Sequence, residues 1–174
     1  MRVIGGELRS RALKSVPGLD TRPTPDRLRE ALFNVLAPRI AGAAFADLYA
    51  GTGAVGIEAL SRGASRAIFV ENNRAPVNVI RENLRALGLE KRAVVRQGRV
   101  LTILPKIEAD IFFLDPPYAL EKEYGLALNS IVSPPGLVIV QHDVRLKLEN
   151  SYGALQRMRE LRQSDNVLSF YAPL

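Results

Sequence analysis

Four consecutive residues have the types that a site for the amine of a flat base needs: Asp115, Pro116, Pro117 and Tyr118. They follow the apolar run 110–114, which predicts a buried strand that ends beside Asp115. An exocyclic amine is a poor nucleophile because its lone pair is delocalised into the ring. A site that activates it must engage both N–H groups with acceptors, which pushes the nitrogen toward a tetrahedral, attacking geometry.

The two prolines suit this chemistry because they would hold the acceptors still. Each proline fixes its own φ near about −65° and restricts the residue before it, so the Asp115 carboxylate and the Pro116 carbonyl would be in place before a substrate arrives. Tyr118 would stack on the face of the base. The same residues also fit an ordinary strand end that runs into a proline-stiffened turn.

A glycine-rich turn lies upstream, between a predicted strand and a predicted helix. The strand 44–50 runs into Gly51-Thr52-Gly53-Ala54-Val55-Gly56, which matches G-x-G-x-x-G, and a helix is expected over 54–62. The glycines allow a tight turn and close approach of the backbone to a nucleotide-like ligand. The pattern alone does not distinguish nicotinamide, flavin and S-adenosylmethionine folds.

Two acidic residues beside this turn favour S-adenosylmethionine as the cofactor. Glu71 follows the next predicted strand, 67–70, at a position where a carboxylate would accept both hydroxyls of a ribose. Asp47 would repel a pyrophosphate, yet it would bind the ammonium of a methionine moiety directly or through water. The expected cofactor site comprises Asp47, Tyr49, Gly51, Thr52, Gly53, Gly56, Glu71 and Asn72, with Gln97 as a further candidate.

The rest of the pattern predicts helices and strands that alternate along an α/β chain. Beyond those named above, helices are expected from Thr24-Pro25 to Pro38, over 74–87 and over 124–132, with a helical connection at 100–106. Strands are expected over 93–96 and 137–140, followed by an antiparallel hairpin of 154–162 and 167–172, and residues 2–16 predict a short hairpin. Residues 118–123 are expected to form a flexible lip over the site.

Length and composition indicate one folded domain. The chain has 174 residues, of which 47% are hydrophobic and 24% charged. It has neither an apolar run of about 18 residues nor a signal-peptide core, so we expect a cytoplasmic protein with no membrane partner. The absence of cysteine excludes a disulfide framework and a cysteine nucleophile, and the single histidine, His142, leaves too few ligands for a typical zinc site. We expect a monomer that holds no metal.

Positive charge is concentrated at the N-terminus. Residues 1–40 contain eight basic and four acidic side chains, which accounts for +4 of the net charge of +6. A basic leading segment on a nearly balanced body favours a polyanionic partner, most often nucleic acid. A contribution to solubility is the other interpretation of the same charge.

Several blocks along the chain resemble the bacterial methyltransferases that modify a guanine exocyclic amine in small-subunit ribosomal RNA. These blocks are Arg-Val-Ile-Gly-Gly at 2–6, Arg22-Pro23-Thr24, 29–34, and the two motifs at 47–56 and 115–118. The resemblance implies a Rossmann-like class I S-adenosylmethionine methyltransferase fold with a seven-stranded, mostly parallel sheet and an antiparallel last strand. It implies catalytic roles for Asp115, Pro116, Pro117 and Tyr118.

The resemblance also implies that residues 1–40 form a basic extension that contacts ribosomal RNA or the small subunit, while 41–174 form the methyltransferase domain. The expected RNA-binding residues are Arg9, Arg11, Lys14, Arg22, Thr24 and Arg29. The sequence departs from the family pattern at two places. Gln97-Gly98-Arg99 stands where related enzymes usually present an acidic residue to the adenine, and the last hairpin turn lacks the usual glycine.

Three other functions fit parts of the pattern. The chain would be an amino-methyltransferase for adenine or cytosine in DNA or for protein glutamine, but DNA enzymes generally need an added recognition domain. It would be an inactive RNA-binding module, against which the intact Asp115 argues. A nicotinamide-dependent dehydrogenase is the third, and it would bind NADH.

Overall fold

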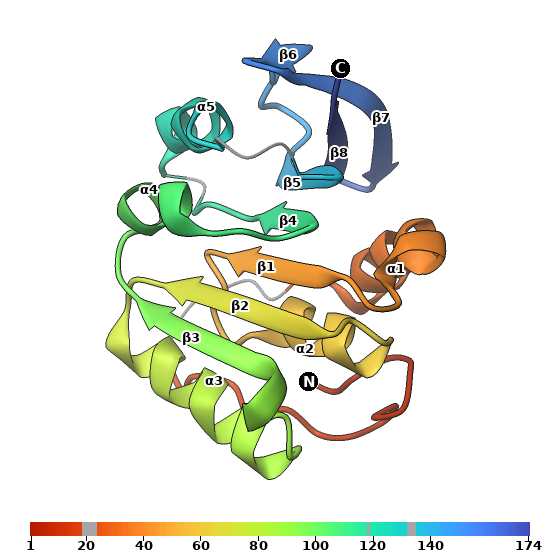
Figure 1. The fold of residues 1–174 in the computed structure, drawn as a ribbon, viewed down its shortest axis with the longest axis vertical. Helices are drawn as coiled ribbons and strands as arrows, with labels where there is room; N and C mark the ends of the chain where they lie inside the picture. The colour runs from red at the N-terminus through yellow and green to blue at the C-terminus, as the bar shows by residue number, and fades with distance from the viewer. Residues whose placement is uncertain (19–23, 118, 132–134) are drawn as a thin grey trace.

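The chain folds around one twisted sheet, described here from a computed structural model that covers residues 1–18, 24–117, 119–131 and 135–174. The described part contains eight strands in the order β3-β2-β1-β4-β5-β8-β7-β6 (Figure 1). They are β1 Ala44–Leu48, β2 Arg66–Glu71, β3 Ala93–Gln97, β4 Ile111–Leu114, β5 Leu137–Asp143, β6 Ser151–Tyr152, β7 Leu155–Gln163 and β8 Asn166–Pro173. Strands β1 to β5 pair in parallel, and β8 pairs antiparallel to β5.

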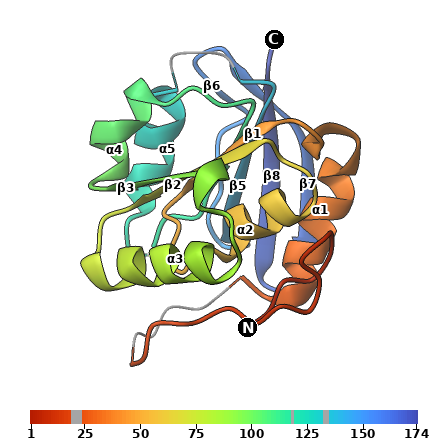
Figure 2. The same ribbon diagram turned by 60° about the horizontal axis from the view of Figure 1, so that its bottom comes forward.

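Helices cover both faces of the sheet, as buried parallel strands require. The helices are α1 Asp26–Ile40, α2 Ala54–Ser61, α3 Arg74–Ala86, α4 Val100–Ile103 and α5 Glu121–Asn129, with short 3₁₀ turns at Glu90–Arg92 and Leu104–Lys106. One core cluster packs α1, α2 and α3 against the sheet, and a second packs α4 and α5 against the other face (Figure 2). In the strand order β3-β2-β1-β4-β5, the direction of the order reverses between β1 and β4. Open α/β sheets bind ligands at such a point.

This architecture confirms the expected class I methyltransferase fold, with differences in detail. The tail forms the predicted antiparallel hairpin, and β6 adds a two-residue eighth strand at its edge. Ser164 adopts φ 56° in the hairpin turn, so a non-glycine residue takes a left-handed conformation that favours glycine.

Three predicted boundaries were wrong for reasons visible in the packing. Helix α1 continues through Pro38 to Ile40, which is 4% exposed and packs in the core, and its N-terminal flank is Pro25, with no side-chain cap. Helix α5 begins at Glu121, so the expected lip is shorter than 118–123. Strand β5 extends past its predicted end and contains His142, which is buried with Nε2 2.8 Å from Ser169 Oγ.

The N-terminal extension lies across the helices rather than away from them. Residues Arg2 and Ala12 form an antiparallel bridge, and the buried side chains of Val3 and Leu13 join the core. The Glu58 carboxylate on α2 accepts the N–H groups of Ile4 and Gly5. No helix within the described ranges is long and apolar enough to cross a membrane.

Candidate active site

The carboxyl ends of five parallel strands bring the two predicted motifs to one edge of the sheet. Leu48 of β1 is in register with Val70 of β2 and with Leu114 of β4, which is in register with Val140 of β5. The residues at the next level, from β3 to β5, are Gln97, Glu71, Tyr49, Asp115 and Gln141. Because neighbouring strands lie about 4.8 Å apart, the glycine turn after β1 and Asp115 after β4 are side by side.

The glycine turn is held by carboxylates from two strands. Gly51 and Gly53 have φ of 56° and 81°, a region that favours glycine. Glu71 Oε1 accepts the Gly51 N–H at 3.1 Å, and Oε2 accepts the Asn73 N–H at 2.8 Å. Asp47 Oδ2 accepts the Gly56 N–H at 2.9 Å. These contacts fix the turn before any ligand binds.

Close packing explains why glycine occupies position 56, in the first turn of α2. A Cβ at this position would lie 2.3 Å from Phe69 Cε1, so α2 can approach β2 only with glycine there. The space beside Gly51 is open, since a Cβ there would meet nothing within 4 Å. The turn is therefore tight against the sheet on one side and accessible on the other.

Asp47 is buried beneath the turn, with 2% of its surface exposed. Burial raises its pKa well above the ordinary value, while the Gly56 N–H opposes that shift, and the charges of Asp115 and Glu71 raise the pKa further. Three carboxyl groups thus act on one another at this edge of the sheet. A cation placed among them would be strongly favoured.

Asp115 differs from the other two carboxyl groups because it has no hydrogen-bond partner among the described residues. The Asp115 residue as a whole is partly exposed, but its carboxyl group is desolvated. This desolvation raises the pKa of the carboxyl to about 7. Nothing in the described chain compensates this cost. A desolvated acceptor at a sheet edge is a typical feature of a functional site.

The carbonyl of Pro116 is held from behind by α5. Tyr124, buried at 1% exposure, donates its hydroxyl to Pro116 O at 3.3 Å. A carbonyl oxygen has two lone pairs, so this contact leaves capacity for a second donor. Pro117 is exposed, and its carbonyl accepts the Leu120 N–H. Tyr118 lies outside the described residues.

The remaining predicted cofactor residues lie in or near the turn and differ in their exposure and contacts. Tyr49 adopts φ 61° and donates its hydroxyl to Glu123 Oε2 at 2.5 Å, which joins the end of β1 to the start of α5. Burial and the neighbouring Glu123 raise the Tyr49 pKa, so the phenol keeps its proton. Asn72 and Gln97 are exposed, and the Thr52 carbonyl accepts a hydrogen bond from Asn83.

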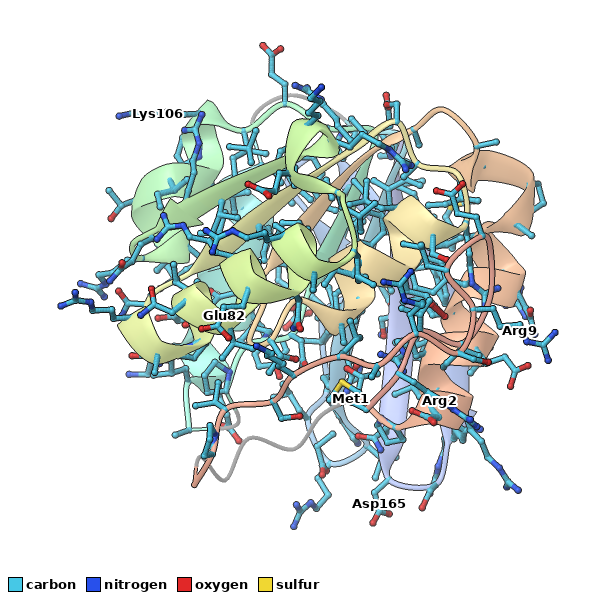
Figure 3. All side chains as sticks on the ribbon, turned by 90° about the horizontal axis from the view of Figure 1, so that it is seen from below. Met1, Arg2, Arg9, Glu82, Lys106 and Asp165 are labelled. Carbon is cyan, nitrogen blue, oxygen red and sulfur yellow. The ribbon has the colours of Figure 1, made fainter. Side chains whose placement is uncertain are left out.

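The predicted RNA-binding residues are spread along the extension. Arg9, Arg11 and Lys14 are exposed, and Arg2 and Arg9 project outward beside α1 (Figure 3). Arg11 also donates to Ala86 O, and Lys14 pairs with Glu82 at 3.3 Å. Arg22 lies outside the described residues.

Thr24 connects the start of α1 to the catalytic edge. Its hydroxyl donates to Gln141 Oε1 at 3.2 Å. Gln141 is buried within the neighbouring strand β5 and lies level with Asp115. Thr24 therefore belongs to the same edge of the sheet as the catalytic motif.

Arg29 does not occupy the surface that the prediction gave it. Only 1% of its surface is exposed, and its guanidinium donates to Arg2 O at 2.7 Å and to Asp26 Oδ1 at 3.2 Å. Burial lowers the pKa of Arg29, while the charge of Glu58 raises it. Arg29 thus fastens the extension to α1, and it offers no exposed cation to a phosphate.

Sequence reasoning missed three residues that support the site: Asn83, Tyr124 and Gln141. All three are polar and buried, so no local pattern shows their partners. A signal was present for Asn83, because it lies one turn after Ile80 and beside Leu84 on the buried face of α3. A polar residue in an apolar stripe indicates a partner inside the fold.

Comparison with known proteins decides the family. A family model described as "Conserved hypothetical protein 95" matches residues 1–172. The ribosomal RNA small subunit methyltransferase D of Escherichia coli K12 is 38% identical over 149 residues, which are 83% of this chain and 75% of that protein. The chain belongs to this family. The resemblance read from the motifs is thereby confirmed.

Other members and solved structures agree with the assignment. The family member from Haemophilus influenzae, with the same name, is 34% identical over 151 residues, covering 81% of this chain and 78% of that protein. The "Putative methyltransferase yhhF" of E. coli has a TM-score of 0.85 at 33% identity and covers 99% of this chain and 97% of its own. An RNA methyltransferase from Salinibacter ruber, solved with S-adenosyl-L-homocysteine, has a TM-score of 0.68 at 19% identity, covers 87% of this chain and 94% of its own, and shares the fold.

Proposed function

We propose that the protein transfers a methyl group from S-adenosylmethionine to the exocyclic N2 amine of a guanine in small-subunit ribosomal RNA. One observation carries the proposal: the desolvated carboxyl of Asp115, which has no hydrogen-bond partner among the described residues, lies one strand away from the accessible glycine turn. The family, whose relatives are named as small-subunit methyltransferases, supports the choice of substrate.

The residues at the turn fit S-adenosylmethionine. Gly51 offers open space for close approach, and Glu71 stands at the end of β2, where a ribose would lie. Asp47 is buried beneath the turn, where a nearby cation would stabilise its ionised form, so the turn favours a cationic ligand over a pyrophosphate. The adenine would lie toward Gln97 and its exposed strand end, where no acidic residue is present at 97–99.

The protein would act by positioning two reactants and polarising one of them. The cofactor supplies a sulfonium methyl group. The Asp115 carboxylate and the Pro116 carbonyl would each accept one N–H of the guanine amine, and Tyr124 would keep the carbonyl in place. Alignment near contact distance contributes roughly 7 to 11 kcal/mol toward lowering the barrier. No strong base is needed, because the nitrogen becomes acidic once the methyl is attached.

RNA would reach this site with its base unpaired and unstacked, because pairing with cytosine engages one of the two N–H groups that the acceptors must bind. Arg9, Arg11 and Lys14 are exposed along the extension and would contact phosphates, together with Arg22, while Thr24 would contact RNA at the catalytic edge. In this proposal residues 1–40 are the RNA-contacting extension and 41–174 the methyltransferase domain. The reaction would take place in the cytoplasm, and the protein would act as a monomer.

Labelled methyl transfer tests the proposal. The protein is incubated with labelled S-adenosylmethionine and either intact small subunits or deproteinised RNA, each from cells that lack it, and the nucleosides are separated by mass spectrometry. We expect label in N2-methylguanosine. Label in adenosine, cytidine or protein, or no label in either substrate, would contradict the proposal. In calorimetry with each ligand titrated separately, S-adenosylmethionine should bind and NADH should not.

A further inference from the structure

One buried amide connects the N-terminal extension to the glycine turn. Asn83 of α3 is 2% exposed, and its Oδ1 accepts the Lys14 N–H at 2.8 Å. Its Nδ2 donates to Lys14 O at 3.1 Å and to Thr52 O at 3.3 Å. The two hydrogens of the amide nitrogen suffice for both carbonyls, so the side chain is shared between two segments far apart in sequence.

The contact with Thr52 fixes a peptide group inside the cofactor turn. The Gly53 N–H, which belongs to the same peptide group as the Thr52 carbonyl, donates to Ala50 O at 2.8 Å. The peptide is thus held at both ends, by Ala50 just after β1 on one side and by Asn83 on the other. Glu71 and Asp47 hold the residues that flank it, but of these three holding side chains Asn83 alone also bonds the extension.

The contact with Lys14 lies where the extension passes over α3. Leu13 is buried in the core, so Lys14 follows an anchored residue. The Lys14 ammonium pairs with Glu82 on the exposed face of the helix (Figure 3 labels Glu82), but both side chains are at least half exposed, and such a pair contributes little. The buried amide is therefore the main polar link between the extension and α3 at this point.

We propose that Asn83 couples the two binding regions, so that RNA held by the extension and cofactor held by the turn strengthen each other's binding. The inference rests on the proposed function. The amide can turn only by breaking its bonds to both segments. A ligand that holds the extension against α3 therefore also holds the amide in the orientation that the Thr52 peptide needs, and by linkage a cofactor that holds this peptide stabilises the extension to the same degree.

Asn83 is a positioning residue in this account, because it acts through the backbones of Lys14 and Thr52. Its test is the ratio of the S-adenosylhomocysteine dissociation constants measured without and with small subunits from cells that lack the protein. S-adenosylhomocysteine carries no methyl group to transfer, so binding is measured without turnover. For the unchanged protein we expect a ratio of about 5 or more, the lower end of ordinary coupling between sites.

The Asn83→Leu variant should reduce this ratio to about 1, since leucine has a similar size and makes none of the three hydrogen bonds. Asn78→Leu is the matched control, because Asn78 is exposed on the same helix, and it should keep the original ratio. A ratio of about 1 in the unchanged protein, or an unchanged ratio in Asn83→Leu, would overturn the inference.

A second pair of variants tests the coupling from the extension, without changing any residue of α3. Lys14→Pro removes the N–H that Asn83 accepts, and Lys14→Ala keeps it; both remove the ammonium. We expect small subunits to slow hydrogen exchange of the amides at 51–56 in Lys14→Ala and not in Lys14→Pro. Equal slowing in both would contradict the inference.

These outcomes are distinct from a failure of the proposed function. A protein that methylates guanine and binds S-adenosylhomocysteine, yet shows no Asn83-dependent ratio, refutes the coupling alone. A protein that binds neither the cofactor nor RNA refutes the function itself.

Discussion

The glycine turn after β1 and the Asp115 motif after β4 lie side by side, but they differ in how far their carboxyl groups are hydrogen-bonded. At the turn, the carboxylates of Asp47 and Glu71 accept three backbone N–H groups, so the loop geometry is complete. At the motif, the carboxyl of Asp115 is desolvated and has no donor from the described residues. The fold completes the cofactor side by itself and leaves the substrate side for an incoming N–H donor to complete.

The difference has an energetic consequence. A carboxylate whose pKa is raised by burial costs stability at every pH above its ordinary pKa, because the unfolded state ionises more easily than the folded one. Asp115 carries such a cost, with a pKa of about 7. A residue that lowers stability, and that no side chain or backbone group in the described ranges holds by a hydrogen bond, is best explained by its role in the reaction.

Replacing Asp115 should reduce methyl transfer more than any other substitution considered, and it directly tests the contrast between the Asp115 motif and the glycine turn. Asp115→Ala removes an acceptor that matters most in the transition state, and methyl transfer should fall about 10²- to 10³-fold, as for other preorganised polar groups at reacting centres. Methyl transfer to small subunits under single-turnover conditions measures this. Undiminished transfer would remove Asp115 from the mechanism.

A second substitution at the same position, Asp115→Asn, is a control for folding. Since the raised pKa of Asp115 destabilises the fold as pH rises from about 4 to about 7, Asp115→Asn should raise the melting temperature at about pH 8 and leave it unchanged at about pH 4. A lower melting temperature at both values would mean that Asp115 is a structural residue.

A smaller effect, on stability and cofactor binding, is expected from substitutions in the glycine turn, where close packing limits the size of the side chain. Gly56→Ala would place a Cβ 2.3 Å from Phe69 Cε1, and the overpacking should cost about 1–3 kcal/mol of unfolding free energy and weaken S-adenosylhomocysteine binding. Gly125→Ala, on the helix α5 with its nearest neighbour at 3.6 Å, is the control and should be neutral or stabilising. Equal stability of the two variants in urea would contradict the packing argument.

The smallest effect concerns the link between the two regions. Tyr49→Phe removes the hydroxyl that joins the end of β1 to Glu123 at the start of α5, and should cost about 1 kcal/mol of unfolding free energy. Methyl transfer should fall by less than in Asp115→Ala. Glu123→Gln keeps an acceptor for the hydroxyl, so a loss in Glu123→Gln as large as in Tyr49→Phe would show that the hydrogen bond is not the cause.

The sequence predicted those parts of the site that depend on local pattern. Glycines at fixed spacing after an apolar strand, and prolines after another, show where each turn begins, and parallel pairing then brings both turns to one edge. The family resemblance added a mostly parallel sheet with an antiparallel last strand. These features needed no knowledge of which side chains meet.

Contacts between distant segments were beyond reach of the sequence. Arg29 looks like a surface cation, yet Phe33 one turn later is fully buried, and the same helix face takes Arg29 into the fold beside Arg2. Asn83 meets Lys14, which is 69 positions away, and Tyr124 meets Pro116 across a turn. Pro38 inside α1 shows that packing of the last turn can outweigh a local signal to end a helix.

The most direct test of the central claim is the pH dependence of kcat/KM for the cofactor, which reports ionisation in the cofactor-free enzyme. Because Asp115 must be ionised to accept the amine, the unchanged protein should lose about tenfold per pH unit below about 7 and reach a plateau above it. Asp115→Asn, which keeps an uncharged acceptor, should be slower at high pH and lack this inflection. An inflection near 7 that is equally present in Asp115→Asn would contradict the account.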